Sequence, residues 1–145
     1  LGLTPELMLM IAEFDSEVTM IREDWEGVKA ARDNLKRRKT TLENDAEEYY
    51  GRAKKCLEKE NDEGARTALT FRQKALDALP GVERDLDDAI FRCEQFQKAM
   101  SLMESQLTDI LNMQRRLASA SASPSEIKAI QDPLVEKFKR WESEA

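Results

Sequence analysis

Few residue types in this chain suit acid–base, nucleophilic or metal chemistry. Carboxylates are plentiful, and the pairs Glu47-Glu48 and Asp87-Asp88 are the kind of groups that act as general acid and base. Both pairs fall on charged helical stretches, where solvation makes carboxyl groups poor catalysts. Histidine does not occur, and the sequence has no glycine-rich phosphate loop, serine-nucleophile motif or paired-cysteine metal motif. The sequence therefore predicts no enzyme activity, no cofactor and no metal site.

The two cysteines, Cys56 and Cys93, are the only candidate thiol nucleophiles. Each falls on an apolar stripe, and neither has a nearby second cysteine or a histidine. We interpret them as buried, reduced thiols, with a disulfide or metal site as the less favoured alternative. This interpretation suits a reducing compartment.

A basic run is the densest cationic cluster. It consists of Lys36, Arg37, Arg38 and Lys39. It could contact an anionic lipid surface or an acidic partner, or its cations could pair with acidic neighbours on the same helix. The formal net charge of the chain is -6, which argues against nucleic acid as a partner.

The elements that carry these groups are predicted to be long helices. The composition is 36% charged and 6% aromatic, with little glycine or proline, as in helical and coiled-coil proteins. Apolar residues recur in alternating steps of four and three from Leu7 to Cys56 and again from Ala65 to Leu117, a spacing typical of a coiled-coil seam. Polar residues interrupt these two seams only at Arg32, Lys39, Arg72 and Gln114.

Between the seams, "KENDEG" (59–64) is the strongest turn signal. We expect an all-α fold in which helices over about 4–58 and 62–118 form an antiparallel coiled-coil hairpin with its tip near 59–64. Asn61 or Asp62 is expected to cap the second helix, and Gly64 to relax the backbone nearby. Facing positions should then sum to about 121, which pairs Trp25 with Phe96, Phe14 with Leu107, Val28 with Cys93, and Tyr49 with Arg72.

The second half of the chain contains two interruptions. Pro80-Gly81 lies within the second seam without changing its phase, so we expect a bend in a continuous helix. The hairpin, residues 1–118, is followed by a linker at 119–125 and a C-terminal segment at 126–145 with one or two short helices. Leu134, Phe138 and Trp141 share one face of that segment, which is expected either to fold back on its own hairpin or to form an oligomer contact.

The tip sequence "YYGRAKKCLEKENDEGARTALTFRQK" resembles the hairpin-tip signature of the phage-shock protein A and plastid vesicle-inducing protein family, members of the ESCRT-III superfamily. That signature has an aromatic residue before an Arg-Ala pair, then Ala-Leu, a short Gly/Asp/Glu turn, and Leu-Ala-Arg-x-Ala-Leu. Glu60 stands where glycine is usual in the turn, and Gly64 where leucine is usual. The matching positions are Tyr49, Arg52, Ala53, Leu57, Ala65, Arg66, Ala68 and Leu69.

The resemblance implies a peripheral membrane protein that assembles with itself and maintains or remodels the membrane under stress. Its expected location is cytoplasmic, on the inner membrane face, or the plastid stroma and thylakoid. Membrane contact is expected mainly through an amphipathic helix upstream of Leu1. The alternative is a soluble coiled-coil module that binds and inhibits a AAA+ transcriptional activator.

Overall fold

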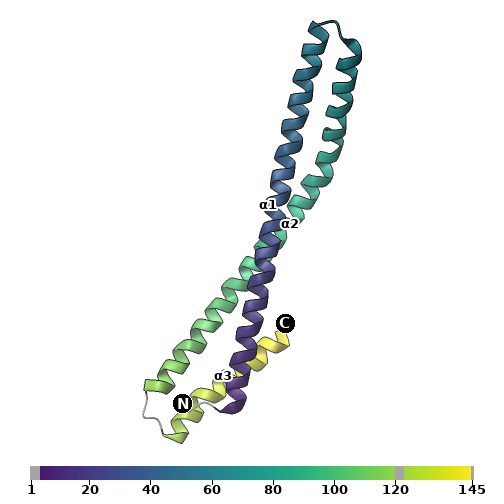
Figure 1. Ribbon diagram of the computed structural model, residues 1–145. Coiled ribbons are helices and arrows are strands. Elements are labelled where there is room, and N and C mark those ends of the chain that lie inside the picture. Colours follow the sequence, from purple (N-terminus) through teal and green to yellow (C-terminus); the bar gives the residue numbers. More distant parts are fainter. Residues whose placement is uncertain (1–3, 120–122, 145) are drawn as a thin grey trace. The chain divides into compact units, whose positions relative to one another are not determined.

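The computed structural model describes residues 4–119 and 123–144, which form three helices. They are α1 (Pro5–Glu58), α2 (Asp62–Ser119) and α3 (Pro124–Glu144). The described residues contain no strand. The long helices α1 and α2 pack against each other and run in opposite directions from the turn that joins them (Figure 1). The predicted all-α helical hairpin is thereby confirmed.

The core of the hairpin follows the predicted seam. Every buried apolar residue of α1 and α2 in the described part of the chain occupies a position of the four-and-three repeat. Because such a repeat keeps one stripe of each helix facing its neighbour, the stripe is removed from water while the remaining faces stay solvated. The buried positions are Leu7, Phe14, Val18, Ala46 and Ala53 of α1, and Ala65, Ala68, Ala75, Val82, Leu86, Ala89, Cys93, Met100, Ile110 and Leu117 of α2.

Helix α1 ends in a Schellman motif centred on Glu60. The N–H of Asn61 donates to the carbonyl of Cys56 at 2.7 Å, and the N–H of Glu60 donates to the carbonyl of Leu57 at 3.1 Å. Glu60 has a φ of 56°, the left-handed conformation that this motif requires and that glycine usually supplies. The turn therefore places a residue with a Cβ where the backbone favours none.

Asn61 also begins the second helix. Its side-chain Oδ1 accepts a hydrogen bond from the N–H of Gly64 at 3.0 Å, so Asn61, rather than Asp62, is the N-cap of α2. The expectation that Gly64 relaxes the turn backbone is wrong, because Gly64 lies in the first turn of α2 and Glu60 carries the positive φ. A Cβ at Gly64 would lie 2.5 Å from Asn61 Nδ2 and 3.0 Å from Cys56 Sγ, so close approach is what favours glycine there.

Both internal prolines are accommodated inside helices. Pro80 is exposed within α2, which continues on either side as expected. Pro133 lies within α3, so the C-terminal segment is one helix rather than two. Ser123 precedes α3, and its Oγ accepts a hydrogen bond from the N–H of Glu126 at 3.4 Å. Helix α3 thus begins inside the predicted linker 119–125, of which residues 120–122 lie outside the described residues.

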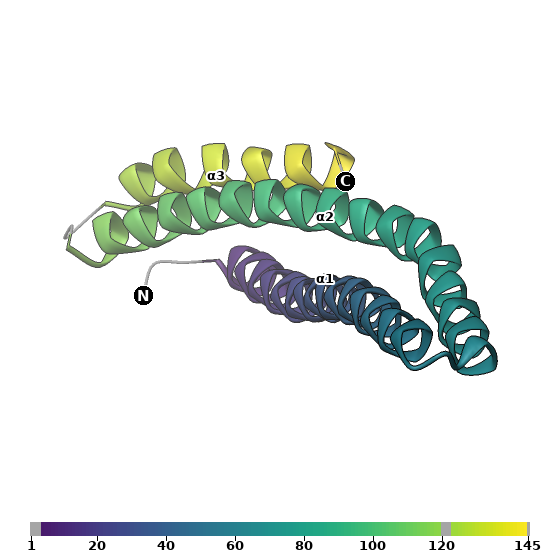
Figure 2. The same cartoon turned by 90° about the horizontal axis from the view of Figure 1, so that it is seen from above.

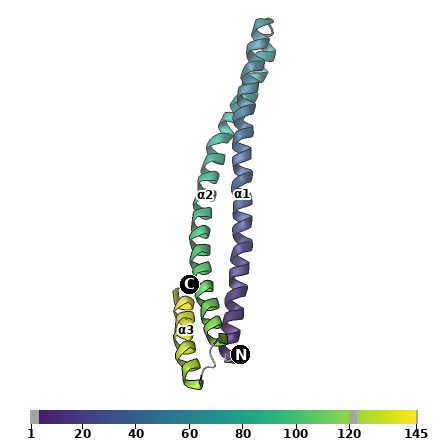
Figure 3. The same cartoon turned by 90° about the vertical axis from the view of Figure 1, so that its left-hand side faces the viewer.

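The chain divides into two compact units. The turn unit is Trp25–Gln95, and the three-helix unit combines Leu1–Asp24 with Phe96–Ala145. Within the three-helix unit, α3 lies alongside the C-terminal part of α2 (Figures 2 and 3). The predicted pair of Trp25 and Phe96 has one member in each unit, so it stays a prediction.

Candidate functional site

The tip motif separates into a buried part and an exposed part within the turn unit. Its alanines, Ala53, Ala65 and Ala68, are buried in the seam, where small side chains let two helices approach closely. Its remaining residues are half-buried or exposed, and Leu57 and Leu69 are 55% and 42% exposed. The motif therefore both closes the hairpin and presents apolar side chains to solvent. The half-buried member is Tyr49, and the exposed members are Arg52, Leu57, Arg66 and Leu69.

Aromatic rings and cations surround this part of the seam. Tyr49 of α1 stacks on Phe71 of α2 with ring centroids 5.4 Å apart, and the Arg72 guanidinium lies 5.1 Å from the ring centroid of Tyr50. Tyr49 thus pairs with Phe71, one residue before the expected Arg72, and Arg72 pairs with Tyr50, one residue after the expected Tyr49. The two observed pairs therefore lie on either side of the predicted register. Further cations lie over three of these rings: Arg52 over Tyr49, Lys54 over Tyr50, and Lys74 over Phe71.

The basic run lies in the middle of α1. Lys36, Arg37 and Arg38 are exposed and Lys39 is half-buried. Arg37 donates a hydrogen bond to Asn34, and none of the four cations forms an ion pair with the described residues. The alternative in which acidic neighbours neutralise the run is therefore not realised there, and its charge faces solvent.

Arg32 is a polar residue in the seam of α1, and it interacts with Cys93 of α2. Its Nε donates a hydrogen bond to Asp33 at 3.1 Å, and this carboxylate raises the pKa of the Arg32 guanidinium above its ordinary value, with Cys93 contributing in the same direction. Cys93 is buried, Cys56 is half-buried, and both are free thiols. Arg32 accordingly enters the seam as a permanent cation held by its neighbour in sequence.

The C-terminal residues expected to form an oligomer contact lie against their own chain. Leu134 and Phe138 are buried, and Trp141 is half-buried. Phe14 of α1 lies 5.8 Å from Phe138 and 5.6 Å from Trp141 between ring centroids, which makes a three-ring cluster in the three-helix unit. The structure shows this intramolecular contact, while a contact with a second copy stays a prediction.

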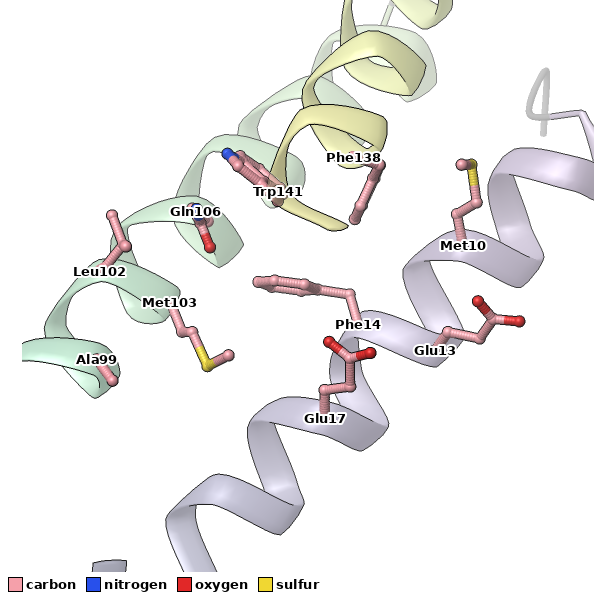
Figure 4. A pocket seen from close by; sticks show the side chains of 10 residues that line it. All are labelled: Met10, Glu13, Phe14, Glu17, Ala99, Leu102, Met103, Gln106, Phe138 and Trp141. Carbon is pink, nitrogen blue, oxygen red and sulfur yellow. The ribbon is translucent and has the colours of Figure 1, made fainter. Parts of the chain in front are cut away.

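An open pocket adjoins the three-ring cluster (Figure 4). Its volume is about 330 Å³, and all three helices contribute side chains to it. In Figure 4 the Phe14 ring extends from α1 towards Trp141 and Met103, with the Glu13 and Glu17 carboxylates on the same helix. The lining is mostly apolar, with Gln106 as the remaining polar group; it comprises Met10, Glu13, Phe14, Glu17, Ala99, Leu102, Met103, Gln106, Phe138 and Trp141.

Sequence reasoning did not predict this pocket. Its lining comes from three segments that are distant in sequence, and only the placement of α3 brings them together. The available signal was the Phe138 and Trp141 pair on one face of α3, which had to cover some apolar surface. The seam repeat gave Phe14 and Met103 as inward-facing residues without indicating that a third helix covers them.

Large apolar side chains also lie outside the seam on both units. Leu9, Met20, Phe91 and Leu102 are each at least 60% exposed. Isolated exposed apolar residues are ordinary, but a pair of long helices with so many of them presents substantial apolar surface. Among the residues that the structure describes, the exposed large apolar side chains are Met8, Leu9, Met20, Tyr50, Leu57, Leu69, Phe71, Phe91, Leu102 and Leu111.

Comparison with known proteins does not identify a family. No family model, curated protein or solved structure matches the chain. No helix within residues 4–119 and 123–144 combines the length and apolar character needed to cross a bilayer. The fold and surfaces thus define an all-helical hairpin with a third helix packed on it, and function must be argued from those surfaces.

Proposed function

We propose that this chain is a subunit of a self-assembling scaffold that lies on a membrane surface and maintains or remodels the membrane, as the resemblance to the phage-shock protein A family implies. In this proposal the protein is cytoplasmic and peripheral on the inner membrane face, or in the plastid stroma on the thylakoid. It acts in response to membrane stress. The proposal assigns it no catalytic role.

The observation that carries the self-assembly proposal is the apolar surface outside the seam. The seam residues already cover one another, so Leu57, Leu69 and Phe91 are surplus to the folding of the hairpin. Covering such side chains against further copies removes apolar area from water at about 25 cal/mol per Å². Many small contacts along a series of hairpins then sum to a stable assembly.

Membrane contact rests on the unpaired basic run. Lys36, Arg37 and Arg38 are exposed and form no ion pair with described residues. A basic cluster near an anionic bilayer gains about 1 kcal/mol per cation, and this gain falls as salt screens it. The run can thus hold an assembled array against anionic lipid even though the whole chain is acidic.

Sedimentation velocity across protein concentration, with and without vesicles of phosphatidylglycerol and phosphatidylcholine, tests the proposal. We expect assembly to rise with concentration and the protein to sediment with the anionic vesicles. Met20→Ser combined with Phe91→Ser should reduce assembly while leaving helix content unchanged, because both side chains are exposed. If the protein stayed monomeric at every concentration and did not sediment with the vesicles, the proposal would be overturned. That result would favour the alternative, a regulatory module that inhibits a AAA+ activator.

A charge-matched pair of variants isolates the basic run. Changing Lys36, Arg37, Arg38 and Lys39 to Gln should abolish vesicle binding in low salt. The control removes the same number of cations from exposed positions elsewhere: Arg84, Lys128, Lys139 and Arg140. Equal loss of binding in both variants would show that net charge, and not the run, governs lipid contact.

A further inference from the structure

The pocket of the three-helix unit is lined by both aromatic and acidic side chains. Phe14, Phe138 and Trp141 form one side of a cavity of about 330 Å³, a size at the small end of the range for ligand sites. Glu13 and Glu17 line the same cavity one helical turn apart on α1. The lining includes no lysine or arginine.

Neither carboxylate has a cationic partner in the part of the chain that the structure describes. The ion pairs between two described residues join Lys29 to Glu26, Arg32 to Asp33, and Arg52 to Glu48, and none of them involves Glu13 or Glu17. Glu13 and Glu17 thus lie beside an apolar cavity without an ion-pair partner among the described residues. An occupant with a positive charge is favoured there, and an anion is disfavoured.

The aromatic rings of the two units differ in whether a cation of the chain lies over them. In the turn unit a cation of the chain itself lies over the rings of Trp25, Tyr49, Tyr50 and Phe71. Within the described residues, no lysine or arginine lies over the three rings of the pocket. Because Phe14 and Phe138 are buried, the half-buried Trp141 is the ring of this pocket that can meet a cation from outside the chain.

We propose that this pocket binds an organic ammonium ion, a cation with an apolar body. The apolar body contacts Met10, Met103 and the rings, while the ammonium group lies near the Glu13 and Glu17 carboxylates. Aromatic faces and carboxylates both attract a quaternary or alkylated ammonium, which is weakly hydrated and loses little on entering such a site. This inference is independent of the proposed scaffold function, because it depends only on the lining of one pocket.

Titration with benzyltrimethylammonium in low salt tests the proposal on the full chain. In a Trp25→Phe background Trp141 is the only tryptophan, so its fluorescence reports on the pocket. The methyl resonances of Met10 and Met103 give a second readout in the chain with Trp25 intact. We expect saturable binding that shifts both methyl signals, and affinity at least fivefold above that for tetramethylammonium, which lacks the apolar body. A linear, unsaturable response would overturn the proposal.

Two comparisons test the contribution of charge. Choline should bind at least fivefold more tightly than its uncharged carbon analogue, 3,3-dimethylbutan-1-ol. Glu13→Gln combined with Glu17→Gln should weaken benzyltrimethylammonium binding about fivefold, which corresponds to about 1 kcal/mol.

The matched control for the carboxylates is Glu43→Gln combined with Glu47→Gln. These two glutamates have the same spacing on α1 but line a separate surface depression beside Tyr50 and Arg72 in the turn unit. The control should leave affinity unchanged. Equal binding of choline and its uncharged analogue, or an equal effect of the two glutamate pairs, would show that the pocket does not recognise an ammonium ion.

Discussion

The two units of this protein bury different kinds of side chain with the same heptad pattern. The largest fully buried side chains, among them Leu7, Met100, Ile110 and Leu134, all belong to the three-helix unit. The turn unit buries mainly alanine, and its aromatic rings stay partly exposed beneath cations. Two helices have no third surface with which to enclose a large side chain, so their seam is made of small residues that let the backbones approach.

The two units also differ in what lies against their aromatic rings. In the turn unit, cations of the chain occupy the faces of Tyr49, Tyr50 and Phe71. In the three-helix unit, Phe14 and Phe138 are covered by other rings and adjoin an open pocket. Substitutions in each unit should therefore affect stability in different ways.

Truncating the centre of the three-ring cluster should have the largest effect on stability. Phe14→Ala removes a ring that is 6% exposed and contacts both Phe138 and Trp141, so we expect a loss of about 3 kcal/mol in the free energy of unfolding. Denaturant unfolding followed by circular dichroism measures it. The control Phe91→Ala removes a ring that is 60% exposed and should change stability by less than about 0.5 kcal/mol. Similar losses in the two variants would show that the cluster is not a core.

Enlarging a seam alanine should destabilise the turn unit by overpacking. Ala68→Leu forces a large side chain into the close approach of α1 and α2 and should cost about 2 kcal/mol. Thermal unfolding compares it with Ala30→Leu, at an exposed position of α1, where about 0.2 kcal/mol is expected from helix propensity alone. A stabilising Ala68→Leu would mean that the seam there is loosely packed.

The turn itself contains two smaller tests. Asn61→Ala removes the side chain that caps α2 through the Gly64 N–H and should cost about 1 kcal/mol. Asn61→Asp keeps an acceptor and should retain most of the stability. Loss of stability in both variants to the same extent would remove the capping role.

The smallest expected effect has the opposite sign. Glu60→Gly relieves the left-handed φ of 56° at the end of α1 and should stabilise the chain by about 0.5 kcal/mol, after the entropy that glycine adds to the unfolded state. Glu58→Gly, inside the last turn of α1, should destabilise it by about 1 kcal/mol. Chemical denaturation of the two variants would contradict this account of the turn if both changed stability in the same direction.

The hairpin could be predicted from the sequence because one periodic pattern specifies both helices and the faces on which they pack together. A repeat of four and three places Leu7 and Leu117 in seams whose nearest available cover is the other seam, and both are buried. The turn was located for a similar reason, since 59–64 is the only dense cluster of turn residues between the two seams. Within the turn, the glycine was a misleading guide to the residue with positive φ. Gly64 is favoured by close packing, and the left-handed φ falls on Glu60.

The placement of α3 could not be predicted, because an amphipathic face does not specify its cover. Leu134 and Phe138 required burial, and an intramolecular and an intermolecular surface satisfy that requirement equally well. The pocket depends on this placement, so it was missed as well. The basic run was recognised from the sequence, while the absence of an ion pair between Lys36–Lys39 and any described residue followed only from the structure.

A double-mutant cycle on Tyr49 and Phe71 tests most directly the central claim, that α1 and α2 fold back on each other in the observed register. Tyr49→Ala, Phe71→Ala and the double variant are unfolded in denaturant, at two protein concentrations to verify that the contact is intramolecular. Because the rings stack at 5.4 Å, the account predicts a coupling energy of about 1 kcal/mol, while Tyr49 with Phe91 should be additive. Additivity of Tyr49 and Phe71 within about 0.3 kcal/mol would contradict the register.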